Sequence, residues 1–231
     1  SNGQGVKVYG SRNLIGGFST GYGNIIKGAS GAGVVVAAKR VDGQLYDPAQ
    51  SNTILGNTIG AVTAAALAQN SPQTNLPIDI ITEDKTGDQT TLGLVGLNAQ
   101  NATAAFGAPN DMLNAPVIKS ASQTSSQVKI VYDLNVPDIK AQQARYRVDF
   151  YLTTTTNIAN AGPAEEYLDG VTVDAGQDQT ATLVLAQGVN TAYRAITASV
   201  TVVGGGPSGI GSTSEFSSNE IVGSFTDTDG D

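Results

Sequence analysis

The chain of 231 residues contains no cysteine, no histidine and no tryptophan. Without cysteine there can be no disulfide, no thiolate nucleophile and no zinc site built on thiolates. Without histidine the chain lacks the usual general base near neutral pH and the usual ligand of transition metals. These two absences exclude catalysis by Ser-His-Asp or Cys-His groups.

Charge is also scarce, because only 14% of the residues are charged, and the net charge is −8. We expect no nucleic-acid partner, since the electrostatic term that drives phosphate binding has the wrong sign. The most apolar stretch, residues 33–38, has the length of a strand, whereas a membrane helix needs about 18 apolar residues. The chain starts at Ser1 without a leader pattern, so we interpret it as a mature product or an excised piece.

Glycine is abundant, with 28 residues, and short apolar phrases recur between residues 12 and 60. Each phrase is led by asparagine and followed by glycine: NLIGG from Asn13, NIIKG from Asn24, NTILG from Asn52 and NTIG from Asn57. We interpret them as successive rungs of a parallel β-solenoid, in which asparagine bonds to its equivalent one coil away and glycine supplies a positive φ. A set of hairpin turns in an antiparallel sheet is the alternative that periodicity leaves open.

These phrases, together with GVVV at residues 33–36, resemble in order the repeats of a family of bacterial secreted right-handed parallel β-helix proteins. The resemblance covers roughly residues 5–60. LPIDII at residues 76–81 is similar to the closing strand of that family, and the prolines around it indicate a strand near an edge. Residues 61–70 lack the acidic and glycine residues of the insertion usual in the family, and we expect a short helical turn at 64–69.

The second half changes to alternating patterns with turn signals about every ten residues, which is typical of an immunoglobulin-like sandwich. The phrases YRVDFYLT, YLDGVTVDAGQ, YRAITASVT and STSEFSSNEIV resemble the sandwich that follows the β-helix in the same family. The apolar alternation covers Val128, Ile130, Tyr132 and Leu134, then Tyr146, Val148, Phe150 and Leu152, then Ala181, Leu183 and Leu185. The predicted strands are residues 116–121, 127–136, 145–155, 166–173, 180–186, 192–203 and 214–222.

The prediction is therefore an all-β chain with a short right-handed parallel β-helix joined to an immunoglobulin-like β-sandwich. The coils would occupy residues 1–97, a linker 98–114, the sandwich 115–224 and an acidic tail 225–231. A solenoid of so few coils is marginal alone. We expect it to be capped by its own sandwich, by a preceding N-terminal portion or by a neighbouring subunit.

Two acidic groups are candidate sites. Asp227, Asp229 and Asp231 stand at alternate positions around Gly230, as in the opening of a calcium loop, and resemble the first residues of thrombospondin type 3 calcium repeats. A solvated acidic tail is the alternative. The second group comprises Asp79, Glu83, Asp84 and Asp88, and it lies where parallel β-helix polysaccharide lyases and hydrolases place acidic residues.

We do not predict catalysis at the second group, because an acidic hairpin tip explains it equally well and no basic residue evidently joins it. Three tyrosines of the solenoid, Tyr9, Tyr22 and Tyr46, would either stack on sugar rings or pack over turns.

The chain is thus expected to be a non-catalytic structural or adhesion module that is secreted or at the cell surface. A component that assembles with itself into a filament or surface layer is one version of this role. Its partners would be other copies of itself, other surface proteins or glycans, with no membrane insertion and with Ca²⁺ as the cofactor. A carbohydrate-binding or accessory module of a secreted polysaccharide-degrading enzyme is the alternative. A virus tail or capsid component is a third class, which an obligate trimer would favour.

Overall fold

The computed structural model describes residues 5–18, 21–29, 32–41, 44–60, 76–81, 109–124, 126–136, 145–154, 163–187, 189, 191, 194–203 and 210–224. These residues form strands, and their one helical element is the 3-10 turn η1 (Pro109–Met112). The all-β class predicted from the sequence is confirmed. Within the described ranges, no helix is long and apolar enough to cross a membrane.

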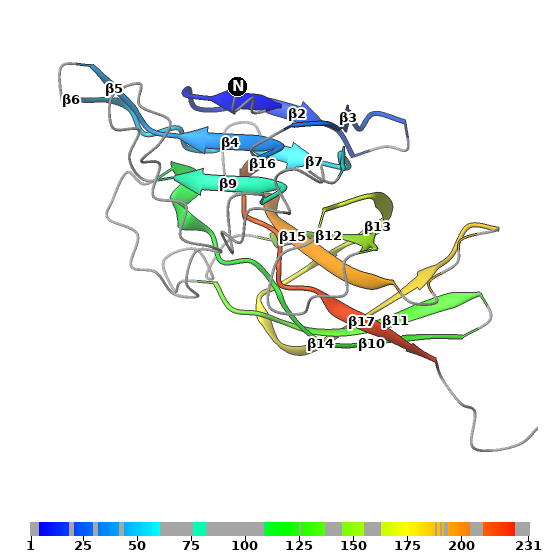
Figure 1. Ribbon diagram of the computed structural model, residues 1–231. Helices are drawn as coiled ribbons and strands as arrows, with labels where there is room; N and C mark the ends of the chain where they lie inside the picture. Colours follow the sequence, from blue (N-terminus) through cyan, green and yellow to red (C-terminus); the bar gives the residue numbers. More distant parts are fainter. Residues whose placement is uncertain are drawn as a thin grey trace, which may run out of the picture.

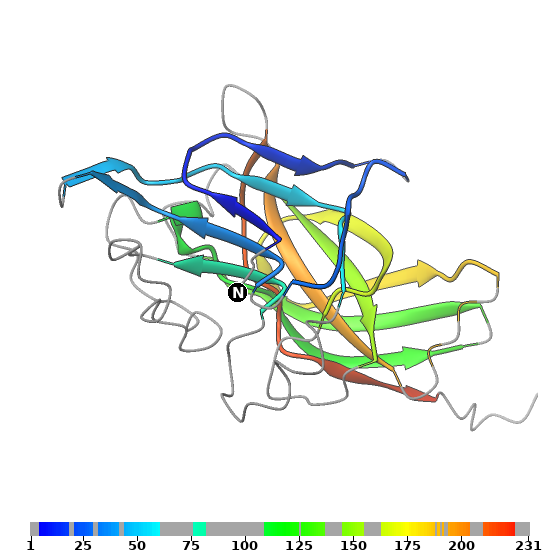
Figure 2. The same cartoon turned by 45° about the horizontal axis from the view of Figure 1, so that its top comes forward.

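The N-terminal strands stack in parallel, one turn of chain upon the next (Figure 1). Coil 1 consists of β1 (Val6–Val8), β2 (Leu14–Gly16) and β3 (Ile25–Ile26). Coil 2 consists of β4 (Val34–Ala37), β7 (Thr53–Leu55) and β8 (Thr58–Ile59), and its strands pair in parallel with those of coil 1 in that order. A further strand, β9 (Ile78–Ile81), pairs in parallel with β4. The hairpin of β5 (Lys39–Val41) and β6 (Gln44–Asp47) projects from coil 2 between β4 and β7 (Figure 2).

The interpretation of the asparagine phrases as successive rungs is wrong in one respect. Asn13 and Asn24 precede two different strands of the same coil, β2 and β3, and their partners in coil 2 are the phrases that begin at Asn52 and Asn57. Eleven positions separate Asn13 from Asn24, which is enough to turn one corner. A whole coil is longer, since Val6 pairs with Val34, 28 positions later.

Valine and isoleucine fill the inside of the coils, because alternate residues of each short strand point inward. Val34, Ile54 and Ile59 of coil 2 are 0–2% exposed and belong to one buried cluster. Glycine is required at the end of β2, where Gly16 has a φ of +86° and a Cβ would collide with the carbonyl of Leu55. The N-x-I-G phrase therefore combines an inward apolar residue with a corner that only glycine can turn.

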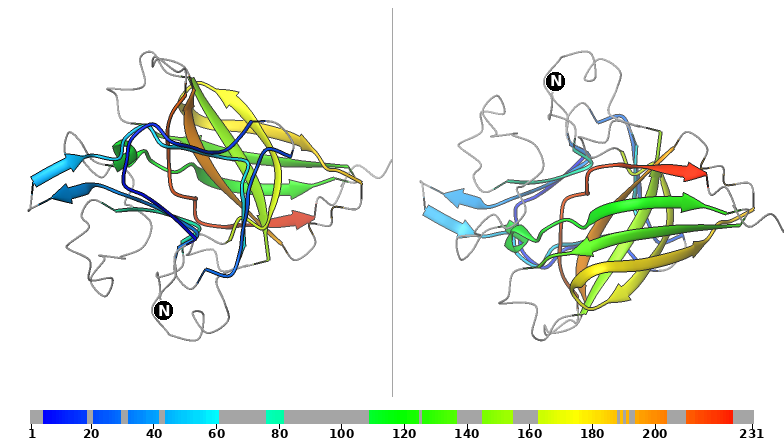
Figure 3. Two further views of the ribbon diagram at one scale, coloured as in Figure 1. Left: turned by 90° about the horizontal axis from the view of Figure 1, so that it is seen from above. Right: turned by 90° about the horizontal axis from the view of Figure 1, so that it is seen from below.

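The C-terminal strands form one eight-stranded sheet, here called the C-terminal sheet, with the order β13-β12-β15-β17-β10-β11-β14 and with β16 paired to β15. All pairs are antiparallel except β10 with β17, which lie side by side in the view from below (Figure 3). The strands are β10 (Val117–Gln123), β11 (Gln127–Leu134), β12 (Arg145–Thr153), β13 (Glu166–Val173), β14 (Gly176–Val184), β15 (Ala195–Val203), β16 (Ile210–Thr213) and β17 (Glu220–Ser224).

The C-terminal sheet curls until it is nearly closed, so that β10, β11 and β14 face β12 and β15 across a buried core. Tyr132 of β11 meets Phe150 of β12 edge to face, with the ring centroids 5.4 Å apart. The predicted alternation of β11 is confirmed, because Val128, Ile130, Tyr132 and Leu134 are all buried. By contrast, β15 is buried from Ala195 to Thr201 without alternation, since both of its faces are covered.

Strand β13 has the predicted bounds, and most others differ from prediction by a few residues at their ends. The last predicted strand, residues 214–222, is wrong. The chain instead forms β16 and β17, and residues 214–219 between them are in neither strand. The reason is that Ser214 and Ser217 use their side chains to bond the backbone of β15, while Glu215 and Phe216 turn toward the coils.

Candidate functional site

The most elaborate part of the described structure is the junction at which the coils rest on the C-terminal sheet. Three residues from the C-terminal half, Tyr151, Ala164 and Phe216, lie in the same buried apolar cluster as the inward residues of coil 2. The rings of Tyr151 and Phe216 pack edge to face with centroids 5.1 Å apart. The coils and the C-terminal sheet therefore share one hydrophobic core at their contact.

Hydrogen bonds to both backbone and side-chain groups of the C-terminal half close the end of the coils at the same junction. In a free solenoid the last strands would present unpaired N–H and C=O groups. Here the segment 211–217 and Ala164 supply partners to β7, β8 and β9. The bonds run from Thr213 N to Asn52 O (3.0 Å), from Ile54 N to Thr213 Oγ1 (2.9 Å), from Ile59 N to Ala164 O (2.7 Å) and from Ile80 N to Glu215 Oε1 (2.9 Å).

A column of three asparagines runs through one corner of the coils into η1. Asn13 donates from its backbone N and from Nδ2 to Oδ1 of Asn52, at 3.0 and 2.9 Å. Asn52 in turn donates its backbone N–H to Oδ1 of Asn110 at 2.8 Å. Asn110 is fully buried and donates from Nδ2 to the carbonyls of Asn52 and Thr213, both at 2.9 Å. This column ties coil 1, coil 2, η1 and β16 together.

A second, shorter column stands at the next corner. Asn24 donates from its backbone N and from Nδ2 to Oδ1 of Asn57, at 2.9 and 3.0 Å. Asn57 is buried and donates from Nδ2 to the carbonyl of Ile15 at 2.9 Å. The predicted bonding of asparagine to its equivalent one coil away is thus confirmed at both corners.

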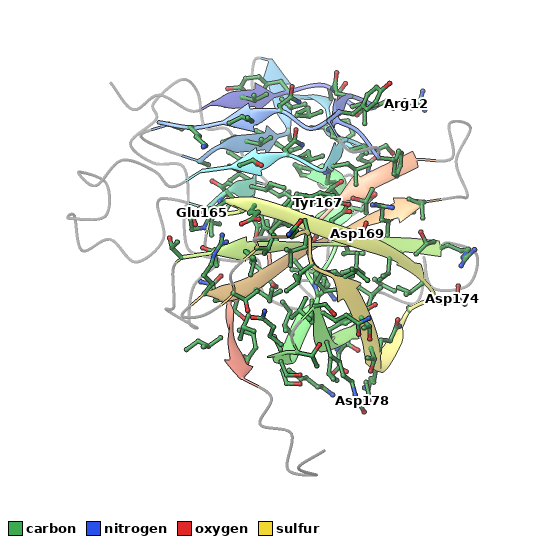
Figure 4. The ribbon with its side chains drawn as sticks, turned by 90° about the vertical axis from the view of Figure 1, so that its right-hand side faces the viewer. Arg12, Glu165, Tyr167, Asp169, Asp174 and Asp178 are labelled. Carbon is green, nitrogen blue, oxygen red and sulfur yellow. The ribbon has the colours of Figure 1, made fainter. Side chains whose placement is uncertain are left out.

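A buried charged group lies beneath coil 1, on the face of the C-terminal sheet that carries the coils. Arg147 Nε donates to Asp149 Oδ1 at 2.9 Å, and Arg147 Nη2 donates to the hydroxyl of Tyr167 at 2.7 Å. Tyr167 donates to Asp149 Oδ1 at 3.0 Å. Phe18 from coil 1 covers the guanidinium of Arg147, 5.6 Å from its ring centroid. Figure 4 shows Tyr167 between the coils and the body of the C-terminal sheet, with Asp178 at the far end.

The electrostatics of this group follow from its burial. Asp149 is 1% exposed, and its Oδ2 has no hydrogen-bond partner among the described residues. Burial raises the pKa of Asp149, and the neighbouring Arg147 opposes that rise. Burial also raises the pKa of Tyr167. Gly170, the register partner of Asp149 on β13, and Phe18 of coil 1 both lie against these charges, so the group is a contact between the C-terminal sheet and coil 1.

The predicted acidic sites are only partly within the described residues. Asp79 lies on β9, is 5% exposed, and burial raises its pKa to about 6. Its predicted companions Glu83, Asp84 and Asp88 are outside the described ranges, as are the predicted calcium ligands Asp227, Asp229 and Asp231. Among the residues that are described, no three acidic side chains come together in a way that could hold a metal ion.

The tyrosines of the coils differ from one another. Tyr9 packs against the small apolar cluster of Ala32 and Val35, with the Lys7 ammonium 4.7 Å from its ring centroid. Tyr22 is 73% exposed. The side chain of Tyr46 is outside the described residues. Tyr9 therefore has the packing role, and Tyr22 keeps the solvent-facing ring that a sugar could stack on.

Sequence reasoning missed the group of Arg147, Asp149 and Tyr167, although a signal was present. In RYRVDFYL, the core residues of β12 alternate with Arg147, Asp149 and Tyr151, so the second face of this strand carries two opposite charges and an aromatic ring. A strand that is apolar on one face and charged on the other is usually solvated on the charged side. Here the coils cover that side.

No protein-family model matches the chain, and no curated protein is significantly similar to it. The resemblance to secreted β-helix proteins consequently stays a prediction, and the geometry of the junction is the firmest guide to what the chain does.

Proposed function

We propose that the chain is a non-catalytic structural or adhesion module of an extracellular or cell-surface protein. In this proposal the stacked strands are the last coils of a right-handed parallel β-helix, and the C-terminal sheet is an immunoglobulin-like sandwich. The parallel rungs, the facing layers and the family resemblance support this more detailed assignment.

The observation that carries the proposal is the shared core of the junction. Tyr151, Ala164 and Phe216 pack among the inward residues of the coils, and the backbone of coil 2 is capped by segment 211–217. Two parts joined by a common apolar core, rather than by a linker alone, move as one body. A stiff body of stacked strands is suited to hold a binding surface away from a membrane or wall, or to bear load along a stalk.

A catalytic role has less support in the described residues. Asp149 is buried under Phe18 and Gly170, and Asp133 is paired with Lys119 at 2.9 Å. Glu165 and Glu166 are paired with Arg194, and among the described residues no three acidic side chains are grouped in a way that could hold a metal ion. The described parts of the chain thus present extended β-sheet surface, and this favours a binding or structural role over a catalytic one.

The proposal predicts that the coils and the C-terminal sheet unfold together. Denaturant titration with hydrogen exchange would report residues 6–26 and residues 127–134 separately, and we expect one common midpoint. Phe216→Ala should separate the two midpoints, because it removes the ring that joins the two halves. Ile221→Ala, which truncates a side chain that is 46% exposed, is the matched control. Coils that melt well before the sheet in the unaltered chain would refute a rigid module.

The extracellular location and the use of calcium are parts of the same proposal and depend on the resemblance and on the Asp227, Asp229 and Asp231 motif. Light scattering across concentration, with calcium and then with a chelator, tests them together with self-assembly. Growth into polymers that requires calcium would support a filament role for that motif. A chain that stays monomeric both with calcium and with the chelator would favour an adhesion module or a passive spacer.

A carbohydrate-binding module is the second candidate, and the exposure of two aromatic rings on coil 1 favours it. Tyr22 is 73% and Phe18 is 42% exposed. Aromatic faces of this kind stack on sugar rings. A glycan array distinguishes the two functions: a hit that Tyr22→Ala abolishes would establish carbohydrate binding, whereas no hit would favour contacts with proteins.

A further inference from the structure

The two coils differ in how well their inward residues are buried. The residues of coil 2, Val34, Ile54 and Ile59, are 0–2% exposed. Three of their register partners in coil 1, Val6, Ile15 and Ile26, are only partly buried, although they point into the same cluster. The fourth inward pair differs less, since Val8 is 7% exposed and Val36 is 0% exposed. Each pair occupies equivalent positions on adjacent rungs. Coil 1 therefore exposes the apolar interior of the stack at one end.

The two ends of the stack also differ in the hydrogen-bond partners of their backbone groups. Strands β1, β2 and β3 each have a strand partner on one side only within the described residues. At the other end of the stack, Thr213, Ala164 and Glu215 already supply partners to β7, β8 and β9. An unpaired sheet edge is a template for another strand. The open end of the coils is thus the face formed by β1, β2 and β3.

The asparagine columns give this open face a direction. In each column, Oδ1 of an asparagine accepts the backbone N–H of the asparagine on the preceding rung: Asn52 accepts from Asn13, Asn57 accepts from Asn24, and Asn110 accepts from Asn52. In the described structure no group donates to Oδ1 of Asn13 or of Asn24. Each column therefore ends at coil 1 in an Oδ1 acceptor. The N–H groups of a preceding rung would bond to that atom.

We propose that the face of β1, β2 and β3 binds one further coil with parallel strands, supplied by the polypeptide on the N-terminal side of coil 1 in a longer form of this protein. That coil would carry apolar inward residues above Val6, Ile15 and Ile26, and it would donate backbone and amide N–H groups to Asn13 and Asn24. The proposal rests on the assignment of the coils as a β-helix made under the proposed function.

A second copy of the chain does not fit this face as well. Stacking head to tail would require the free edges of β7, β8 and β9, which the junction covers. Two copies placed face to face would set the Oδ1 acceptors of one against those of the other, so neither asparagine column would continue in the direction of its existing bonds. The continuity of register from coil 2 to coil 1 instead favours a rung that arrives in parallel.

The test is a duplication of the first coil. A copy of residues 6–33, inserted directly before Val6, extends the stack by the 28-position spacing that already separates Val6 from Val34. We expect hydrogen exchange of the amides in the original β1, β2 and β3 to slow by about tenfold or more, because each becomes an internal strand. An insert of the same 28 residues in scrambled order is the control and should leave exchange unchanged.

Two further variants separate specific stacking from a general effect of added chain. Asn13→Ala and Asn24→Ala made only in the inserted copy should reduce the protection in part, because the side-chain amide donors of both columns are lost while the backbone N–H donors remain. Ile15→Ala should shift the unfolding midpoint more in the duplicated protein than in the original chain, since Ile15 becomes fully buried there.

Unchanged exchange in the duplicated protein would overturn the proposal, and so would a duplicated chain that is insoluble while the scrambled control folds. Protection of β1, β2 and β3 in the original chain that grows with protein concentration would assign the face to a second copy instead. Failure of the proposed function has a different signature, namely separate melting of coils and sheet, which does not depend on the duplication.

Discussion

Asn110 is the residue whose replacement tests the junction most directly, because its side chain joins η1 to coil 2 and to β16. It is fully buried, accepts one hydrogen bond from Asn52 and donates two, to the carbonyls of Asn52 and Thr213. Replacement by alanine removes all three bonds and leaves the buried backbone N–H of Asn52 without its acceptor, whereas the carbonyl of Asn52 keeps the bond from Thr213 N. At about 1 kcal/mol for each bond, the loss is about 3 kcal/mol.

The backbone adds to this loss. Asn110 has a φ of 42°, a left-handed conformation that asparagine tolerates better than alanine, which adds about 1 kcal/mol. We therefore expect Asn110→Ala to lower the free energy of unfolding by about 4 kcal/mol, a large part of the roughly 5–15 kcal/mol available to a folded protein. Guanidinium titration followed by circular dichroism at the β-sheet band and by tyrosine fluorescence measures it.

Asn24→Ala is the matched control, because Asn24 is the same residue type in the exposed end of the other column. Its side chain donates one bond, to Asn57, and we expect a loss of about 1 kcal/mol. If Asn110→Ala costs no more than Asn24→Ala, the junction does not depend on the asparagine column and the reasoning is wrong.

Three other predictions concern buried groups. Burial raises the pKa of Asp79 from 3.8 to about 6, so the folded state binds the proton more tightly and stability falls as pH rises from about 4 to 6, by about 3 kcal/mol in all. Asp79→Asn should remove that pH dependence in urea titrations and be more stable than the parent at pH 7; an unchanged pH profile would contradict this. Phe216→Ala should lower the free energy of unfolding in guanidinium titration by about 4 kcal/mol, because the ring is buried. Ile221→Ala, which truncates an exposed side chain, should lower it by less than about 1 kcal/mol. Equal losses would argue against the shared core. Gly170→Ala would place a methyl group against the Asp149 carboxylate and the Arg147 guanidinium. We expect the free energy of unfolding from thermal melts to fall by about 2–3 kcal/mol. An unchanged melt would mean that the buried pair can shift at little cost.

The local features of this protein were predictable from its sequence because they depend on neighbours along the chain. Strand β11 was predicted through its alternation of buried and open side chains, a period that any two-sided strand imposes. The corners were predicted as asparagine and glycine positions because Gly16 needs a positive φ and asparagine can bond across rungs. The all-β class followed from these two signals.

What the tertiary structure decided are the pairings between distant residues. Whether Asn13 meets Asn24 or Asn52 depends on the length of a coil, and the turn-rich insertion that forms the hairpin of β5 and β6 lengthens coil 2 between β4 and β7. The break between β16 and β17, and the burial of Asn110 inside the stretch predicted as a linker, arise because these segments cap the coils. Arg147 and Asp149 have the spacing of a solvated face, and only the coils that lie above them turn that face into the centre of the junction.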